Sequence, residues 1–372
     1  MQTGAGPGFN IQSGNMHMLN TFHRPLLGFA AAVLSLASLG AHAASQYKVT
    51  NIGLPTGSTY FSPFAINDTG AIAGIAGNTT GNRDAFLWSG GTFTNLGALY
   101  RGGGLNNAGT VVGQSASGQG VVVSQGKVTE LPALAGASGA YPLGINQAGT
   151  IVGGSGGQAA IWKNGQVQPL GPVPSQGTST LAVAINDSGV SIGSSGDFVS
   201  RPLLWSADGT VTELENPPAG YEPSPRDLNN TGLVVGVSQG IHSLDAVVWR
   251  NGVGEALPRF KYADGAATAV NDAGQIVGIT YAYWDTSTLA TLWQDGQVYD
   301  LNDLLVNGQG SYDLTDAFDI NAFGQILAQD GVSGRVVLLT PVPEPSTYAL
   351  LGFGLVSLAL VRRQRSAASG TA

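Results

Sequence analysis

The 372-residue sequence contains no cysteine, and only 10% of its residues are charged. The absence of cysteine excludes disulfide bonds and metal sites with thiolate ligands. Of its 15 Lys and Arg residues and 23 Asp and Glu residues, 11 and 22 lie between residues 44 and 341. This central region is therefore acidic and lacks the basic surface that binding to nucleic acid requires. Histidine is also scarce, because three of the four histidines precede residue 43 and only His242 follows it.

What the sequence has in abundance is glycine, with 56 residues, together with serine, threonine and asparagine. A composition that is rich in glycine and β-branched residues and poor in charge favours short strands joined by tight turns. The 298 residues from 44 to 341 suffice for one large domain or two ordinary ones. Three segments are predicted: an N-terminal extension with a signal peptide over 1–43, a repeat domain over 44–341, and a sorting signal over 342–372.

The central segment is an internal repeat, marked by a hydrophobic residue followed by Asn-x-x-Gly. The marker occurs seven times, at Asn67, Asn106, Asn146, Asn186, Asn229, Asn271 and Asn321. Its copies are spaced by 39, 40, 40, 43, 42 and 50 residues, and the longest interval contains an insertion around 301–313. Such a turn fits a hairpin, because the Asn side chain bonds the turn backbone and glycine adopts positive φ without strain.

Each unit is predicted to form four strands, which in the first unit are 60–66, 71–76, 84–88 and 92–96. A second hairpin signal recurs between strands three and four, as Asn164-Gly165, Asp208-Gly209, Asn251-Gly252 and Asp295-Gly296. A tryptophan ends strand three in most units, namely Trp88, Trp162, Trp205, Trp249 and Trp293, and Val123 replaces it in the second unit. A repeated aromatic residue at one strand position is typical of a core between units, with ligand stacking as the alternative.

Seven units of about 42 residues with four strands each predict an all-β fold, a seven-bladed β-propeller. The seventh unit ends after its third strand, Arg335–Thr340, whereas the segment Tyr47–Leu54 matches the fourth strands of other units. We therefore predict that the N-terminal strand closes the ring by pairing with 335–340, which removes an open sheet edge. The alternative is an open β-solenoid or two smaller β domains, neither of which uses that ring-closing strand.

Both ends of the chain carry targeting features. An apolar run at 26–40 follows His23 and Arg24 and leads to Ala41-His42-Ala43, a cleavage site for signal peptidase with cleavage after Ala43. At the other end, Val342-Pro343-Glu344-Pro345-Ser346 precedes the apolar span 347–361 and the basic residues Arg362, Arg363 and Arg365. As a transmembrane helix, fifteen residues reach only about 22 Å against roughly 30 Å of hydrocarbon, which suits temporary retention. The arginines favour a cytoplasmic C-terminus.

The C-terminal arrangement resembles the PEP-CTERM sorting signal of Gram-negative bacteria. The resemblance implies transit to the cell envelope and cleavage at the motif by an exosortase, so this membrane protease is the expected processing partner. The repeat itself, best seen in Ile66-Asn67 and Ala85-Phe86-Leu87-Trp88, resembles the HAF-type extracellular repeat. That resemblance supplies no catalytic residues. Together they imply a protein anchored transiently in the inner membrane, with its body in the periplasm, that then reaches the outer surface or the medium.

Candidate catalytic residues are few, and we predict a protein that is not an enzyme. His242 lies beside Ser243 and Asp245, but neighbouring residues of one loop do not normally adopt triad geometry. A carboxylate pair of the glycosidase type is the alternative, although most aspartates fall in repeated turns. Asp68, Asp187 and Asp272 follow marker asparagines and offer oxygen ligands for calcium, with ordinary turn chemistry as the competing interpretation. No metal and no cofactor are predicted.

The predicted ligand face is the one formed by the longer connections, after strands two and four. It carries the aromatic residues Tyr221, Tyr262, Tyr281, Tyr283 and Trp284. Aromatic side chains on loops suit sugar stacking and protein contacts, with packing between neighbouring loops as the alternative. The predicted function is binding or structure in the envelope or the extracellular polysaccharide matrix, with polysaccharide or envelope proteins as partners. The alternative is an exported propeller hydrolase that acts on polysaccharide.

Overall fold

The structure of the protein is a computed structural model. It describes residues 44–81, 83–97, 99–171, 179–196, 200–218, 221–239, 244–261, 263–282, 287–306 and 311–343. All of these residues belong to one compact unit, 44–372. The signal peptide, the apolar span and the three arginines of the sequence analysis lie outside the described residues.

The described residues form seven antiparallel sheets of four strands each. The innermost strands are β2 (Tyr60–Ile66), β6 (Leu99–Leu105), β10 (Ala140–Ile145), β14 (Thr180–Ile185), β18 (Tyr221–Leu228), β22 (Ala263–Val270) and β26 (Leu314–Ile320). The second strands are β3 (Ile72–Gly77), β7 (Val111–Ser115), β11 (Ile151–Ser155), β15 (Ser191–Ser195), β19 (Val234–Gln239), β23 (Ile276–Ala282) and β27 (Ile326–Asp330). The third are β4 (Arg83–Ser89), β8 (Gly120–Ser124), β12 (Gln158–Lys163), β16 (Arg201–Trp205), β20 (Leu244–Arg250), β24 (Thr288–Gln294) and β28 (Arg335–Val342). The outermost are β5 (Thr92–Gly97), β9 (Lys127–Glu130), β13 (Gln166–Pro169), β17 (Val211–Glu213), β21 (Val253–Ala256), β25 (Gln297–Asp300) and β1 (Gln46–Asn51).

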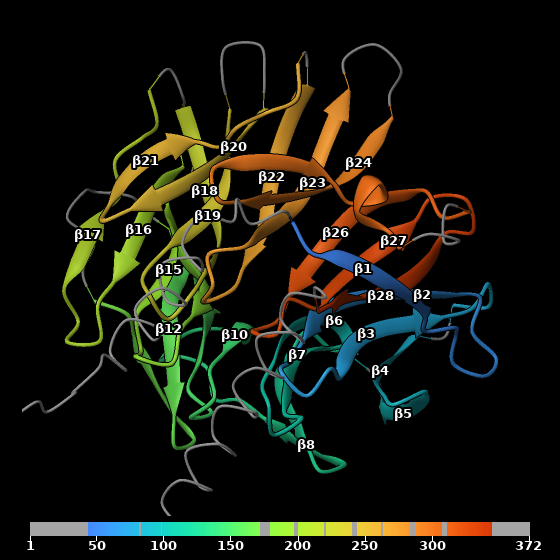
Figure 1. Ribbon diagram of the computed structural model, residues 1–372. Coiled ribbons are helices and arrows are strands. Elements are labelled where there is room, and N and C mark those ends of the chain that lie inside the picture. Colours follow the sequence, from blue (N-terminus) through green and yellow to red (C-terminus); the bar gives the residue numbers. More distant parts are fainter. Residues whose placement is uncertain are drawn as a thin grey trace, which may run out of the picture. The chain divides into compact units, whose positions relative to one another are not determined.

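This is the predicted seven-bladed propeller, and its blades follow one another in sequence order around the ring (Figure 1). The seventh blade has the order β1-β28-β27-β26, so the N-terminal strand supplies its outermost strand. In Figure 1, β1 in blue lies beside β28 in red, and their register pairs Gln46 with Val342 and Asn51 with Val337. The predicted closure is confirmed, with β28 two residues longer than expected.

The repeated tryptophans belong to the core between blades, as predicted. Their side chains are at most 6% exposed, and Val123 in the second blade is 1% exposed. Three indole N–H groups also donate hydrogen bonds to carbonyl oxygens of the connection that leaves the preceding blade: Trp162 to Pro132, Trp249 to Glu215 and Trp293 to Pro258, at 2.6–2.9 Å. These three tryptophans therefore join apolar burial to a polar contact with the connection behind them.

A β-bulge interrupts every innermost strand a few residues before the marker asparagine. The bulge explains another regular feature of the repeat, which is a glycine seven residues after the marker asparagine in six of the seven blades. A Cβ atom at Gly153 or Gly193 would overlap the carbonyl oxygen of Tyr141 or Leu181 in the bulged strand. Glycine is thus required there because the two backbones approach too closely for a side chain.

The marker asparagines form a closed ring of hydrogen bonds around the propeller axis. In each turn the side-chain oxygen accepts from the backbone N–H four residues later, at 2.9–3.1 Å. The side-chain N–H2 group donates to the backbone carbonyl of the next blade's asparagine, at 2.8–3.3 Å. The seventh bond, from Asn321 to Asn67, spans 254 residues and completes the circle. All seven side chains are buried, at 3–5% exposure.

One predicted turn has a different form, and the predicted insertion contains a short helix. Asn164, Asn251 and Asp295 have positive φ before a positive-φ glycine, as the predicted two-residue turns require. At Asp208-Gly209 only the glycine does, and Ser206 to Thr210 form a longer turn whose N–H groups bond within it. The predicted insertion at 301–313 begins with a 3-10 helix, η1 (Leu301–Leu304), which Asp300 caps by accepting a hydrogen bond from the Asn302 N–H.

The asparagine ring predicts a specific cost for the substitution Asn186→Asp. Aspartate retains an oxygen for the Val190 N–H but cannot donate to Asn229, and it places a buried charge against that carbonyl oxygen. We expect the free energy of unfolding to fall by roughly 3 kcal/mol. Urea unfolding followed by tryptophan fluorescence measures this loss.

The matched control is Ser188→Ala, which removes only the hydroxyl that donates to the Asn186 side chain. It should cost about 1 kcal/mol or less, because a single hydrogen bond in a partly exposed turn contributes little. Equal losses in the two variants would show that the bond between blades is not important for stability.

Candidate functional site

The propeller has two unlike faces. The face that we call the turn face carries the turns between strands one and two, which contain the marker asparagines, and those between strands three and four. The opposite face, the loop face, carries the connections between strands two and three and between successive blades. The innermost strands line a channel between the two faces.

A second polar ring surrounds the mouth of the channel on the turn face. The backbone N–H of the residue after each marker asparagine donates to the side chain of its counterpart in the next blade. These bonds run from Asp68 to Asn107, Gln147, Asp187, Asn230 and Asp272 in turn, and from Ala322 back to Asp68, at 2.8–3.0 Å. Ala322 has no polar side chain, so the circle lacks its bond from Asp272. The enclosed space is only about 170 Å³.

Two aspartates lie deeper in the channel, where the other blades have glycine or alanine. Asp227 and Asp319 stand two residues before the marker asparagines of the fifth and seventh blades, and they line a cavity of about 220 Å³. Their carboxylates bridge to the next blade in the same way. One oxygen of Asp227 accepts from the Val270 N–H and the other from the Leu228 N–H, both at 2.8 Å. Asp319 accepts from Ile66 and Ile320 at the same distance.

The channel makes these two carboxyl groups weak acids. Loss of solvation raises the pKa of Asp227 to about 6, against two backbone hydrogen bonds that lower it. Desolvation and, to a smaller extent, repulsion from Asp227 raise the pKa of Asp319 to about 7. Arg226, beside them in the channel wall, has a pKa lowered by desolvation, while Tyr281 acts in the opposite direction. Protons are thus held in the channel at a pH where exposed aspartates are ionised.

A cavity opens on the loop face, between the second, third and fourth blades. Its volume is about 670 Å³, and its wall includes Gln114, Gln119, Tyr141, Ser155, Thr180 and Ser194. These residues lie near the ends of second strands, at the starts of first strands and in a turn between a second and a third strand. Every lining residue that the structure describes is uncharged.

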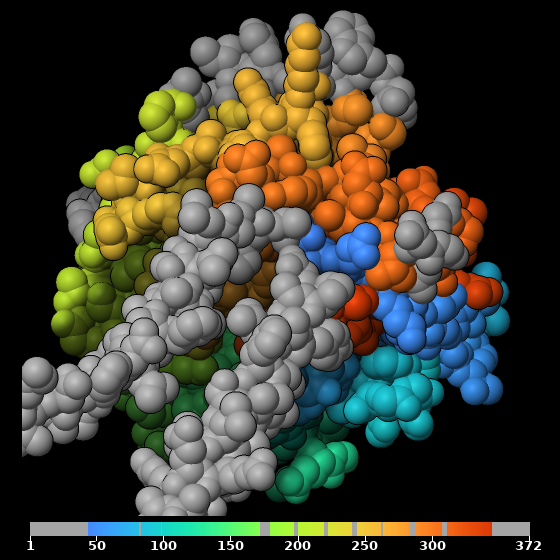
Figure 2. Space-filling model, viewed as in Figure 1, coloured from blue at the N-terminus to red at the C-terminus, as the bar shows by residue number. Residues whose placement is uncertain are grey.

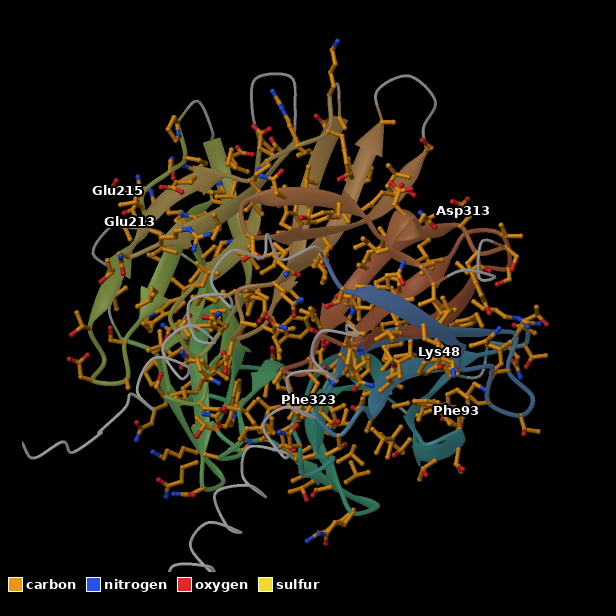
Figure 3. The ribbon with its side chains drawn as sticks, in the orientation of Figure 1. Lys48, Phe93, Glu213, Glu215, Asp313 and Phe323 are labelled. Atoms are coloured by element: carbon orange, nitrogen blue, oxygen red, sulfur yellow. The ribbon has the colours of Figure 1, made fainter. Side chains whose placement is uncertain are left out.

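The described chain begins and ends on the turn face. β28 runs toward that face, and its last residue, Val342, pairs with Gln46, the first residue of β1. Pro341 confirms the location, because it lies near Gly324 in the marker turn of the seventh blade. Phe323 of that turn is 68% exposed. Figure 3 shows Phe323 near the middle of the ring, whereas Glu213 of the outermost strand β17 lies at its periphery.

Only part of the predicted ligand face falls within the described residues. The backbone of Tyr221 begins β18, and Tyr281 lies near the end of β23 with 38% of its surface exposed. Strand β23 extends to Ala282, which pairs with Ala263 at the start of β22. Tyr262, Tyr283 and Trp284 lie outside the described residues, as do Ala41, Ala43, His242 and Ser243.

The structure describes only the first two residues of the predicted sorting motif, but it describes all three aspartates that were considered as calcium ligands. Val342 ends β28 and Pro343 follows it, whereas Glu344, Pro345 and Ser346 lie outside the described residues. Asp68, Asp187 and Asp272 do not converge on one point and instead take part in the ring at the mouth. Within the described ranges, no group of three or more His, Asp or Glu side chains is placed to hold a metal ion.

The channel aspartates were not predicted from the sequence, although the sequence contains a signal for them. Aligning the seven markers places Ala65, Gly104, Gly144, Ala184 and Ala269 at one position, with Asp227 and Asp319 as the two exceptions. An acid at a position otherwise held by the smallest residues indicates a site facing open space. The cavity on the loop face has no comparable signal, because its residues come from three blades and share no repeat position.

Residues 341–365 match the family model of the PEP-CTERM protein-sorting motif. The chain thus carries this motif near its C-terminus, which implies export, sorting to the cell surface and processing by an exosortase. Of the helices in the described ranges, none has the length and apolar character to cross a membrane. The predicted span 347–361 lies outside those ranges.

The chain matches no protein of curated function. Among solved structures it is similar to a streptogramin B lyase, with a TM-score of 0.51 and 11% identity over 80% of this chain and 98% of that one. A virginiamycin B lyase from Staphylococcus aureus gives a TM-score of 0.46 and 13% identity over 80% and 100% of the two chains. The β-propeller domain of the Trilobed protease from Pyrococcus furiosus gives 0.48 and 8% over 76% and 96%. At such identities the similarity shows the fold alone.

The raised carboxyl pKa values predict that stability falls as the pH rises. In the folded protein Asp227 and Asp319 hold protons up to about pH 6 and 7, whereas in the unfolded chain they release them near 3.8. The folded state therefore binds more protons between these values, and the free energy of unfolding decreases from about pH 4.5 to 7.5. The loss is on the order of a few kcal/mol, since one pKa unit corresponds to about 1.4 kcal/mol.

Urea unfolding at several pH values measures this slope, and Asp319→Asn should flatten it because the amide does not titrate. Asp208→Asn is the control. Its carboxyl is exposed and has a pKa lowered by hydrogen bonds from Thr210, so the slope above pH 4.5 should persist. A wild-type slope in the Asp319→Asn variant would contradict the assignment.

Proposed function

We propose that this protein is a non-catalytic binding module that the cell exports, anchors briefly and presents at its surface or in the extracellular polysaccharide matrix. The observation that supports the proposal most directly is the position of the chain ends. Both β1 and β28 meet the turn face at one strand pair, Gln46 with Val342, while the large cavity opens on the opposite face. A precursor held by its C-terminal tail would therefore turn the loop face away from the membrane.

The distance between the propeller and the membrane supports this orientation. The predicted span starts at Thr347, only five residues after the last residue of β28. A fully extended chain covers at most about 3.5 Å per residue, so the tether is shorter than about 20 Å. Such a tether is shorter than a domain diameter, and it keeps the turn face next to the bilayer. The repeat's resemblance to HAF-type extracellular repeats agrees with a role outside the cell.

The channel aspartates favour the alternative, an exported hydrolase, because acids with raised pKa values are typical of catalytic sites. Their hydrogen bonds argue for a structural role instead. All four carboxylate oxygens accept backbone N–H groups, two of them from the neighbouring blade. The cavity beside them, about 220 Å³, is also smaller than the roughly 300–1,000 Å³ of most ligand sites. We infer that these acids join blades rather than cleave a substrate.

The proposed orientation predicts different labelling of two single-cysteine variants of the anchored precursor. Ser138→Cys lies on the loop face and Ala148→Cys on the turn face of the same blade, and both positions are exposed. The natural chain has no cysteine, so each variant carries one thiol. In spheroplast membranes a bulky maleimide should modify Ser138→Cys at least several-fold faster.

In the released protein the two rates should become similar. Mass spectrometry identifies that form, with an N-terminus near Ala44 and loss of the sequence beyond Pro343-Glu344-Pro345. Equal labelling in the precursor, or an intact C-terminus at Ala372 in the medium, would contradict the proposal.

The non-catalytic role predicts an absence of turnover. The mature protein, assayed with glycosidase and esterase substrates, should show no more activity than the double variant Asp227→Asn, Asp319→Asn. Activity that the double variant loses while its fold is retained by circular dichroism would favour the hydrolase instead.

A further inference from the structure

The cavity on the loop face has the construction of a ligand site. At about 670 Å³ it lies within the range of small-molecule sites. Part of its wall is made by glycines at the turns between second and third strands, including Gly118, Gly156 and Gly157 with positive φ. Side chains are absent there, so backbone amides and carbonyls form part of the wall.

Hydrogen bonds hold the polar wall in place before any ligand arrives. The Gln114 amide donates to the carbonyl oxygens of Gly118 and Ala140, which connects two blades. The Ser155 hydroxyl donates to Gly139 and accepts from the Leu134 N–H. Tyr141 has its hydroxyl fixed by Arg101 at 3.1 Å. A wall that is already ordered loses little conformational entropy on binding.

The chemistry of the wall selects a class of ligand. No described lining residue is charged, so the wall itself offers no ionic partner for a phosphate or a carboxylate, whose burial is costly without one. Apolar side chains are few, chiefly Leu181 and Ala140, which disfavours a lipid. Amides and hydroxyls predominate, and both donate and accept hydrogen bonds. The ring of Tyr141 adds an apolar surface of the kind that packs against sugars.

We propose that this cavity binds a neutral polysaccharide segment through its hydroxyl groups. The inference rests on the proposed function and assigns its ligand class and its location. The site lies on the face away from the chain ends, so an anchored or matrix-bound protein can reach polymer outside the cell. Figure 2 shows the blades around the ring in sequence order, and the second to fourth, which form the cavity, are coloured from cyan-green to yellow-green.

The test uses the mature protein and four hexasaccharides in isothermal titration calorimetry. Cellohexaose, laminarihexaose and mannohexaose are neutral, whereas hexagalacturonate has the same size and carries six carboxylates. We expect at least one neutral probe to bind, and hexagalacturonate to bind at least about tenfold more weakly. The proposal is wrong if hexagalacturonate is the only probe that binds tightly. It is also wrong if none of the four probes binds.

Two variants place the binding in the cavity. Tyr141→Ala removes the aromatic surface and should weaken binding at least about tenfold, equivalent to about 1.4 kcal/mol. Gly139→Leu should abolish it by filling the space, because a Cβ atom there meets no atom closer than 3.5 Å and the backbone φ is ordinary. Circular dichroism and thermal unfolding verify that both variants fold.

Phe323→Ala, on the turn face, is the matched control and should bind as the wild type does. Tyr281→Ala tests the competing location on the sixth blade. If Tyr281→Ala weakens binding while Gly139→Leu does not, the cavity is the wrong site but surface binding stands. If the wild type turns over a probe, the proposed function itself is wrong. These outcomes separate the two inferences.

Discussion

The asparagine ring is the interaction on which the rest of the structure depends. Each marker side chain performs two tasks, because its oxygen holds its own turn and its N–H2 group holds the next blade. A carboxamide places an acceptor and a donor on two separate atoms of one short side chain, whereas ionised aspartate has no donor and serine has a single oxygen for both. The ring closes only when the last blade meets the first, from Asn321 to Asn67. Blade number is therefore determined by polar geometry at the axis as well as by apolar packing between sheets.

This ring has consequences for the two faces. The turn face repeats one hydrogen-bonded arrangement seven times, so its sequence is tightly constrained. The loop face is free of that constraint, and there the connections differ from blade to blade and enclose the cavity beside Tyr141. The channel between them shows the same division. Bulges direct one residue per blade inward, and Asp227 and Asp319 use that position to extend the polar connections between blades.

Sequence alone predicted the features that repeat. The seven markers predicted the blade number, and the five tryptophans predicted the core between blades. The displaced strand 47–54 predicted the closure by β1. The bulges were not predicted, because an inserted residue shifts the alternation within the innermost strand, and the glycine that accommodates it lies on the partner strand. The cavity was missed for a different reason. Gln114, Tyr141 and Thr180 approach one another only through tertiary packing, and no spacing within a unit reports on contacts among three units.

The closing strand connects the fold to its passage through the membrane. β1 is near the start of the exported region, yet its partner β28 is separated from it by nearly the whole propeller, as Gln46 and Val342 show. The entropic cost of closing a loop grows only slowly with the length of the loop. Pairing two strands so far apart in the sequence is therefore thermodynamically accessible. Until β28 pairs with β1, the seventh blade lacks its outermost strand. The matched sorting motif begins at Pro341, one residue before β28 ends at Val342. The signal for processing therefore overlaps the end of the strand that pairs with β1.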